Sequence, residues 1–199
     1  GRKVTFKQIH DDALRLANSL LDLGIRKGDV VAIQLPNQIE FMTVYYAVSM
    51  IGAVLSTMHM PYRSAEMEPL LRHGSARAVV CPPAGENYDA PATMCELRNR
   101  VETLEHVIVA AGNAADDTLS LDALITEGSA TQIENPPVAS DPAILCFTSG
   151  TSSAPKAVVH SYQTMLANNR IAAPIYNMTG EDVVLGGPPF THAFGICVM

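Results

Sequence analysis

The sequence lacks the short motifs that mark several common kinds of site. It contains no Gly-x-Gly-x-x-Gly, so a dinucleotide site is poorly supported, and no Walker-type Gly-x-x-x-x-Gly-Lys followed by Ser or Thr. The histidines show no His-x-x-x-His spacing, and the cysteines show no Cys-x-x-Cys spacing. These absences argue against a Rossmann dinucleotide enzyme, a P-loop nucleotidase and a zinc site.

Positive charge is also scarce and is dispersed along the chain. Lys and Arg number 13 against 20 Asp and Glu, which gives a net charge of −7. Because no basic stripe is present, we expect neither nucleic acid nor an anionic membrane as a partner. A bound polyphosphate would instead need one locally placed cation, and Lys156 is the candidate.

Charged residues are missing from the whole stretch between Phe41 and Tyr62, which is nominally long enough to span a bilayer. Polar side chains interrupt this stretch, and Gly52 divides it into two parts of different character. Polar residues at mid-span are costly in lipid. The pattern therefore favours a buried helix followed by a buried strand, with no transmembrane segment.

The four cysteines are typical of structural thiols. Two of them, Cys146 and Cys197, lie inside apolar runs, where cysteine behaves as a small hydrophobic residue. Free thiols and the absence of a signal peptide pattern predict a cytoplasmic protein. A metal or disulfide role stays open as the weaker alternative.

Short apolar runs alternate with amphipathic stretches along most of the chain, and the two periodicities predict strands and helices. The predicted helices are 5–24, 36–52, 64–74, 92–100, a short one after Ser120, and 161–176. The predicted strands are 30–33, 53–57, 78–81, 107–110, 143–147, 157–160 and 183–185. Continuous apolar strands alternating with helices predict an α/β fold with a doubly wound, mostly parallel sheet flanked by helices. The connection from 147 to 157 is too short for a helical crossover and predicts a local hairpin.

That hairpin connection has an unusual composition. Residues 147–156 read Phe-Thr-Ser-Gly-Thr-Ser-Ser-Ala-Pro-Lys, which places several hydroxyl groups, a glycine and a lysine in one loop. Hydroxyls and backbone N–H groups can surround phosphate oxygens, and a lysine adds a compact positive charge. A serine-rich surface turn is the alternative, because Ser, Thr, Gly and Pro also dominate ordinary loops.

Thr148-Ser149-Gly150-Thr151 followed by Pro155-Lys156 resembles the Thr-Ser-Gly-Thr-Thr-Gly-x-Pro-Lys-Gly signature of the adenylate-forming acyl-CoA synthetases. The resemblance extends to Val4-Thr5-Phe6, to Gly24 through Ile33 and to Pro36-Asn37. It implies that Lys156 and the loop bind the β- and γ-phosphates of ATP, the loop residues being Thr148, Ser149, Gly150, Thr151, Ser152 and Ser153. The family usually has glycine at the positions of Ser153 and Ala157. A non-glycine residue at a left-handed position costs about 1–2 kcal/mol. If the Ser153 position is left-handed, we expect a phosphate grip that is altered, weakened or dependent on ligand.

A second segment, Pro188 to Gly195, contains a histidine between aromatic residues. Taken alone, such a histidine is more often a packed, hydrogen-bonded residue than a catalytic one. The segment is similar to the Pro-x-Phe-His-x-x-Gly stretch of acyl- and aryl-CoA ligases. That resemblance places His192 near the reacting carboxylate and phosphate, with Phe190, Phe194 and Gly195 shaping the acyl and adenylate site. It favours a fatty or other apolar acid as substrate.

The resemblance implies an ATP-dependent, AMP-forming carboxylate–CoA ligase. Its substrates would be a carboxylic acid, ATP and coenzyme A, and Mg²⁺ would bridge the phosphates, with Thr151 as a candidate contact. No catalytic residue is assigned within this segment. Two alternatives stay open: a non-catalytic or degenerate nucleotide-binding relative, and an adenylation domain that charges a carrier protein. A homo-oligomer also stays open.

The chain is predicted to be the N-terminal part of a larger, multi-subdomain domain. Residues 1–128 would form a first α/β subdomain, 129–142 a connecting loop, and 143–199 the phosphate-loop hairpin, a helix and the start of the acyl-pocket segment. The apolar run that ends at Met199 predicts a fragment. The adenine, ribose and catalytic-lysine sites of the family would lie beyond it, so the fragment alone should be inactive.

Overall fold

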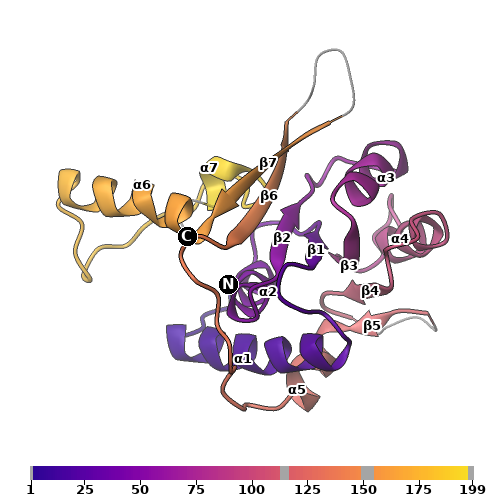
Figure 1. Ribbon diagram of the computed structural model, residues 1–199, viewed down its shortest axis with the longest axis horizontal. Helices are drawn as coiled ribbons and strands as arrows, with labels where there is room; N and C mark the ends of the chain where they lie inside the picture. The colour runs from indigo at the N-terminus through magenta and orange to yellow at the C-terminus, as the bar shows by residue number, and fades with distance from the viewer. Residues whose placement is uncertain (1, 113–116, 149–154, 197–199) are drawn as a thin grey trace.

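The chain folds around one twisted sheet with helices on both of its faces (Figure 1). The computed structural model describes residues 2–112, 117–148 and 155–196. The helices are α1 (Phe6–Asp22), α2 (Ile39–Met50), α3 (Ser64–His73), α4 (Ala90–Arg98), α5 (Leu121–Glu127), α6 (Tyr162–Ile175) and α7 (Ala193–Ile196). The strands are β1 (Val30–Ile33), β2 (Val54–Thr57), β3 (Ala76–Cys81), β4 (His106–Val109), β5 (Leu119–Ser120), β6 (Pro142–Thr148) and β7 (Lys156–Ser161).

The strand order is β5-β4-β3-β1-β2-β6-β7, and every pair is parallel except β6–β7. The chain leaves β1 toward β2 and then crosses back to β3, so the crossover helices must lie on opposite faces if each connection is right-handed. A doubly wound, mostly parallel sheet was predicted from the alternating apolar runs, and the structure confirms it.

Side chains alternate between two cores along the central strands. Val31 and Ile33 pack with α1 and α2 on one face, whereas Ala32 packs with α3 and α4 on the other. Both faces are buried, which is why these strands are apolar at every position. Cys81, at the end of β3, is fully buried in the second core, and burial raises the pKa of its thiol to about 12. This thiol is therefore a packing group.

The predicted hairpin is present. Strand β6 adds to the sheet beside β2, with Leu55 opposite Ile144, and β7 then runs back along β6. The antiparallel register extends to Thr148 opposite Lys156. The hairpin projects from the layered body of the protein (Figure 1).

The stretch without charges between Phe41 and Tyr62 forms a buried helix and a buried strand, as predicted, namely α2 and β2. Among the residues that the structure describes, no helix is long and apolar enough to cross a membrane.

One predicted strand is wrong. Residues 183–185 have no strand structure, and Val183 and Leu185 are 98% and 90% exposed. Three apolar residues stand between a turn at Thr179–Asp182 and Gly186-Gly187, and no described strand pairs with them. An apolar run becomes a strand only when a partner edge satisfies its backbone groups. The two-residue strand β5 was not predicted, because its residues look like the start of α5.

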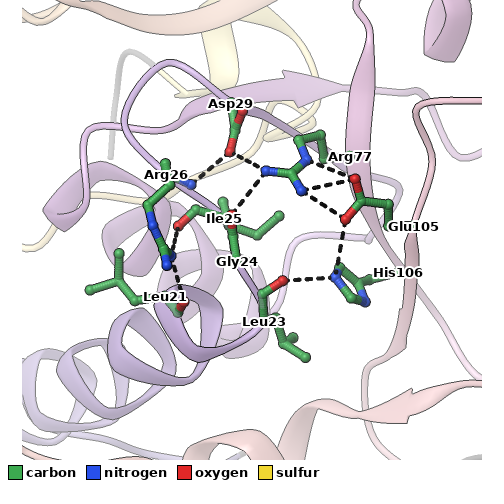
Figure 2. Close-up of polar contacts among 9 residues, drawn as sticks. All are labelled: Leu21, Leu23, Gly24, Ile25, Arg26, Asp29, Arg77, Glu105 and His106. Atoms are coloured by element: carbon green, nitrogen blue, oxygen red, sulfur yellow. Dashed lines mark hydrogen bonds and ion pairs between the residues drawn. The ribbon is translucent and has the colours of Figure 1, made fainter.

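Arg77 joins three elements at the amino-terminal edge of the sheet (Figure 2). Its guanidinium contacts Glu105 at 2.7 Å and Asp29 at 2.8 Å, and donates to the carbonyl of Gly24 at 2.9 Å. Next to it, His106 lies 3.0 Å from the carbonyl oxygen of Leu23. These contacts hold the α1–β1 turn against the starts of β3 and β4. Hydrogen bonds to the two carboxylates are the main cause that raises the pKa of Arg77.

Replacing this guanidinium should destabilise the fold. We expect Arg77→Met to lower the free energy of unfolding by about 2 kcal/mol, because hydrogen bonds to charged groups are worth roughly 1.5–3 kcal/mol and partners at the Gly24 turn are left unpaired. The control is Lys7→Met, which removes an exposed ion pair with Asp11 and should have a much smaller effect, because exposed ion pairs contribute little to stability. Urea unfolding curves measure both. Equal effects of the two substitutions would show that the Arg77 cluster adds nothing beyond a surface pair.

Candidate functional site

The candidate site lies where the carboxyl ends of β2 and β6 meet the segment that precedes α7. In open α/β sheets, ligands bind outside the carboxyl ends of the strands. A cavity of about 110 Å³ opens at this place. It is lined by Thr57, His59 and Tyr62 from the β2 side, by Cys146, Phe147 and Thr148 of β6, and by Thr191, His192 and Ala193.

Two histidines from distant parts of the chain meet in this cavity. The rings of His59 and His192 stack with centroids 6.1 Å apart and planes 19° apart. His59 Nδ1 lies 3.0 Å from the hydroxyl oxygen of Thr191, whose side chain is buried. Burial, and secondarily the neighbouring His192, lowers the pKa of His59 from its usual 6.5. His59 is therefore held mainly as the neutral ring.

The local backbone defines which nitrogen of His192 can donate. The N–H of Phe194 donates to His192 Nδ1 at 3.1 Å. Because Nδ1 accepts this bond, the proton of the neutral ring lies on Nε2. His192 therefore offers an N–H donor from a ring that lines the cavity. Such a donor can bind a carboxylate or phosphate oxygen.

Asn37, which follows β1, holds the segment before α7 in place. Its side-chain amide donates to the carbonyl of Pro188 at 2.8 Å, and its amide oxygen accepts from the N–H of Phe190 at 2.7 Å. The Phe190 ring packs against Phe41 of α2, with centroids 5.5 Å apart. The segment is thus anchored by a polar contact with Asn37 and an apolar contact with Phe41.

The predicted phosphate-loop residues are only partly described. Thr148 ends β6 and lines the cavity, whereas Lys156 begins β7, is opposite Thr148 in the hairpin register and is exposed. The remaining predicted residues, Ser149, Gly150, Thr151, Ser152 and Ser153, lie outside the described residues. Phosphate binding by this loop stays a prediction.

Ala157, the second departure from the family signature, lies in β7 opposite Phe147. It is not among the described non-glycine residues with positive φ. A strand residue of this kind needs no glycine, so Ala157 introduces no backbone strain.

The predicted acyl-site residues are brought near one another but differ in burial. His192 lines the cavity, Phe190 is half-buried against α2, and the Phe194 ring is 63% exposed. Gly195 is buried within α7. The roles of the two phenylalanines in binding an acyl group stay predictions.

His59, Thr191 and Asn37 were missed as site residues. His59 and Asn37 each follow a strand at its carboxyl end, and this position alone could have suggested them. Their sequence spacing carries no motif, because they meet residues more than 130 positions away through the fold.

No group of three or more His, Cys, Asp or Glu side chains within the described ranges is arranged to hold a metal ion.

Gly195 is a position where only glycine fits. A Cβ there would lie 2.5 Å from the carbonyl carbon of Pro189 and would overlap its oxygen. We expect Gly195→Ala to displace the segment that carries His192, to cost about 1–3 kcal/mol of stability and to reduce activity of the intact protein. Gly187→Ala is the matched control in the same segment, because nothing lies within 4 Å of the added methyl group. Thermal unfolding and turnover measure both variants; unchanged values for Gly195→Ala would contradict the described packing.

The lowered pKa of His59 has a consequence for stability against pH. Below pH 6.5 the unfolded chain binds a proton at this histidine before the folded chain does, so the free energy of unfolding falls as the pH falls toward the folded pKa. We expect His59→Asn to lose less stability than the wild type between pH 7 and about pH 5. Urea unfolding at several pH values measures the difference. Parallel curves would show that His59 titrates alike in both states.

Comparison with known proteins agrees with the geometry. A sequence model of the family described as AMP-binding enzyme matches residues 1–199. The chain is 30% identical to a medium-chain fatty-acid–CoA ligase of Escherichia coli (strain K12) over 98% of its own length and 35% of that enzyme. It is 28% identical to a salicylyl-CoA synthase / salicylate adenylyltransferase of Streptomyces sp., over 96% of its length and 36% of that protein. The chain thus spans about a third of the length of each of these two relatives.

The fold is likewise similar to part of a solved structure. The apo structure of Mycobacterium smegmatis MbtA superposes with a TM-score of 0.85, at 28% identity, over 98% of this chain and 37% of that one. The shared sheet is the mostly parallel one described above. Since the family model covers all of its residues and the relatives are acyl-CoA ligases, the chain belongs to the AMP-binding enzyme family of adenylate-forming ligases.

Proposed function

We propose that the intact protein is an ATP-dependent, AMP-forming carboxylate–CoA ligase and that this chain supplies part of its adenylation site. The observation that carries the proposal is the meeting of Thr148, at the base of the hairpin loop, with His192 in one cavity at the carboxyl edge of the sheet. In a member of this family, that arrangement supports a site for both an anionic acid and the phosphates of ATP.

The reaction would proceed in two steps. A carboxylate oxygen of the acid attacks the α-phosphorus of ATP, the bond from that phosphorus to the bridging oxygen breaks, and pyrophosphate leaves. The thiolate of coenzyme A then attacks the acyl carbon of the acyl-adenylate, and AMP leaves. Both reactants of the first step are anions, so the protein has to align them and offset their repulsion.

The residues of this chain would serve that alignment. The Nε2–H of His192 would donate to an oxygen of the carboxylate or of the α-phosphate. The loop between β6 and β7 would hold the departing pyrophosphate, with Lys156 adding positive charge at its base. Mg²⁺ would arrive with ATP and neutralise phosphate charge, and Thr151 is the proposed contact near it.

The acid would be apolar. Phe190, Ala193 and Phe194 surround His192 along the chain, and they offer no partner for a second charge on the substrate. Two of the relatives are named for a medium-chain fatty acid and for salicylate, which are both largely apolar acids. We therefore propose a fatty or aromatic monocarboxylic acid. We also propose a cytoplasmic location, in line with the buried thiol of Cys81.

This chain alone should be inactive. Its cavity of about 110 Å³ is well below the roughly 300–1,000 Å³ of a drug-sized ligand site, so further residues would have to complete it. Several apolar side chains on β7, α6 and the following loop are exposed, namely Val159, Ile171, Ile175, Tyr176, Val183 and Leu185. Exposed apolar patches commonly mark interaction surfaces. We propose that the remainder of the intact protein covers these side chains and supplies the adenine, ribose and catalytic-lysine sites.

An adenylation domain that charges a carrier protein is the second candidate, because one relative is named both as a CoA synthase and as an adenylyltransferase. A non-catalytic nucleotide-binding relative is the third, and Ser153, in place of the usual glycine, is the feature that favours it. The acceptor of the acyl group separates the first two candidates, and turnover separates both from the third.

The function is tested with the intact protein, ATP, Mg²⁺ and a panel of straight-chain and aromatic acids. We expect pyrophosphate exchange that depends on an apolar acid, followed by thioester formation with free coenzyme A. Transfer to a carrier protein but not to coenzyme A would support the second candidate. Binding of ATP without pyrophosphate exchange for any acid would support the third. Measurable turnover by the 199-residue chain alone would contradict the proposal that the rest of the intact protein completes the site.

Lys156 provides a sharper test of the phosphate loop. We expect Lys156→Ala in the intact protein to raise the KM for ATP about tenfold, because a charge-assisted hydrogen bond to phosphate is worth roughly 1.5 kcal/mol or more. The KM for the acid should change little. Lys3→Ala is the control, since this exposed lysine lies before α1 and far along the chain from the loop. An unchanged KM for ATP in Lys156→Ala would remove Lys156 from the phosphate site.

A further inference from the structure

His59 stands on a rigid turn that follows β2. The side chain of Gln34, which is fully buried, donates to the carbonyl of His59 at 3.0 Å and to that of Tyr62 at 3.1 Å. The hydroxyl of Tyr88 donates to the Gln34 amide oxygen at 3.3 Å. The guanidinium of Arg63 lies 3.9 Å from the centre of the Tyr88 ring. Both ends of the turn are thus held by one buried amide, which leaves the backbone of His59 little freedom.

The ring of His59 is also fixed on three sides. Tyr62 meets it edge-on, with centroids 5.2 Å apart. Thr191 meets its Nδ1 at 3.0 Å, and His192 stacks against its face. Two successive residues of the segment before α7, Thr191 and His192, therefore contact one side chain on the turn that follows β2.

The same segment has few other contacts that could set the direction of His192. Asn37 holds its start, at Pro188 and Phe190, and the backbone of His192 is bonded to Pro189. These contacts fix the backbone, but they do not set the side-chain torsions of His192, whose ring is exposed. Only the Phe194 N–H and the His59 ring are described as partners of the His192 ring.

We propose that His59 is a positioning residue for His192. It holds the Thr191–His192 turn through the Thr191 hydroxyl, and it holds the His192 ring by stacking. The Nε2–H donor of His192 thereby stays in the cavity. The catalytic contribution of this device rests on the proposed function, whereas the positioning itself does not. Two stacked imidazoles repel each other when both are charged, and the lowered pKa of His59 agrees with a neutral ring in this place. The His59–Thr191 contact links the turn that follows β2 to the segment before α7, 132 residues away in sequence.

The kinetic test uses a double-mutant cycle in the intact protein. His59→Phe keeps a stacking ring but removes Nδ1, and Thr191→Val removes the hydroxyl at nearly constant shape. We expect each to lower kcat for adenylate formation on the order of tenfold while the KM for ATP changes less than about twofold, because a small misplacement of a reacting group is costly. The double variant should show the same loss of about tenfold, since both changes break one contact.

Two further variants separate positioning from general damage. His59→Asn can still offer a side-chain nitrogen to Thr191, so it should recover part of the activity that His59→Phe loses. His10→Asn, on the exposed surface of α1, is the matched control and should leave kcat unchanged. If the losses in the cycle multiply to about a hundredfold, or if His59→Asn is no better than His59→Phe, the hydroxyl contact does not position His192.

A readout without activity keeps the two proposals apart. Histidine ¹⁵N NMR of the intact protein reports which ring nitrogen of His192 carries the proton, with the signal assigned by its loss in His192→Gln. We expect a dominant Nε2–H form in the wild type and a mixed or shifted signal in both His59→Phe and Thr191→Val. Thr191→Val serves if His59→Phe fails to fold. Unchanged His192 signals would overturn the positioning role even in an active enzyme. If the wild type activates no acid while the two variants still shift the His192 signal, the proposed function alone is overturned.

Discussion

The pairing of β6 with β2 is the interaction on which the candidate site depends. It sets Leu55 opposite Ile144 and so brings the end of the hairpin, at Thr148, beside the turn that follows β2. The strands on the far side of β1 carry the helices α3 and α4 and bury the second core, but they contribute no residue to the cavity. Parallel strands place their carboxyl ends at one edge, so one added strand pair is enough to join distant segments into a site.

The two edges of the sheet carry different kinds of polar contact. At the amino-terminal edge, Arg77 links three elements through charged and backbone partners, which fixes the frame (Figure 2). At the carboxyl edge, neutral groups predominate: the Gln34 amide, the Thr191 hydroxyl and the His59 ring. A neutral, partly buried surround lowers the local dielectric and would strengthen interactions with the anion that we propose binds there. The stabilising Arg77 contacts and the proposed site thus lie at opposite edges of the same sheet.

The sequence predicted the architecture well, because continuous apolar strands and helical periodicity are local signals. The hairpin was predicted from a loop too short for a crossover, and β6 and β7 confirm it. The strand at 183–185 was wrong, since pairing depends on a partner edge that no local pattern reveals. His192 was predicted through a motif and lines the cavity, whereas His59 and Asn37 were missed, because they reach this place through contacts across more than 130 residues. The burial of Thr191 and the tautomer of His192 likewise depend on the assembled fold.

The most direct test of the account is a crystal structure of the intact protein with a non-hydrolysable acyl-adenylate analogue. We predict that the phosphate mimic lies within hydrogen-bond distance, about 3 Å, of His192 Nε2 and faces the loop between β6 and β7. The stacking of His192 on His59 should be retained. An analogue bound away from the carboxyl ends of β2 and β6, with His192 turned from it, would contradict the central claim.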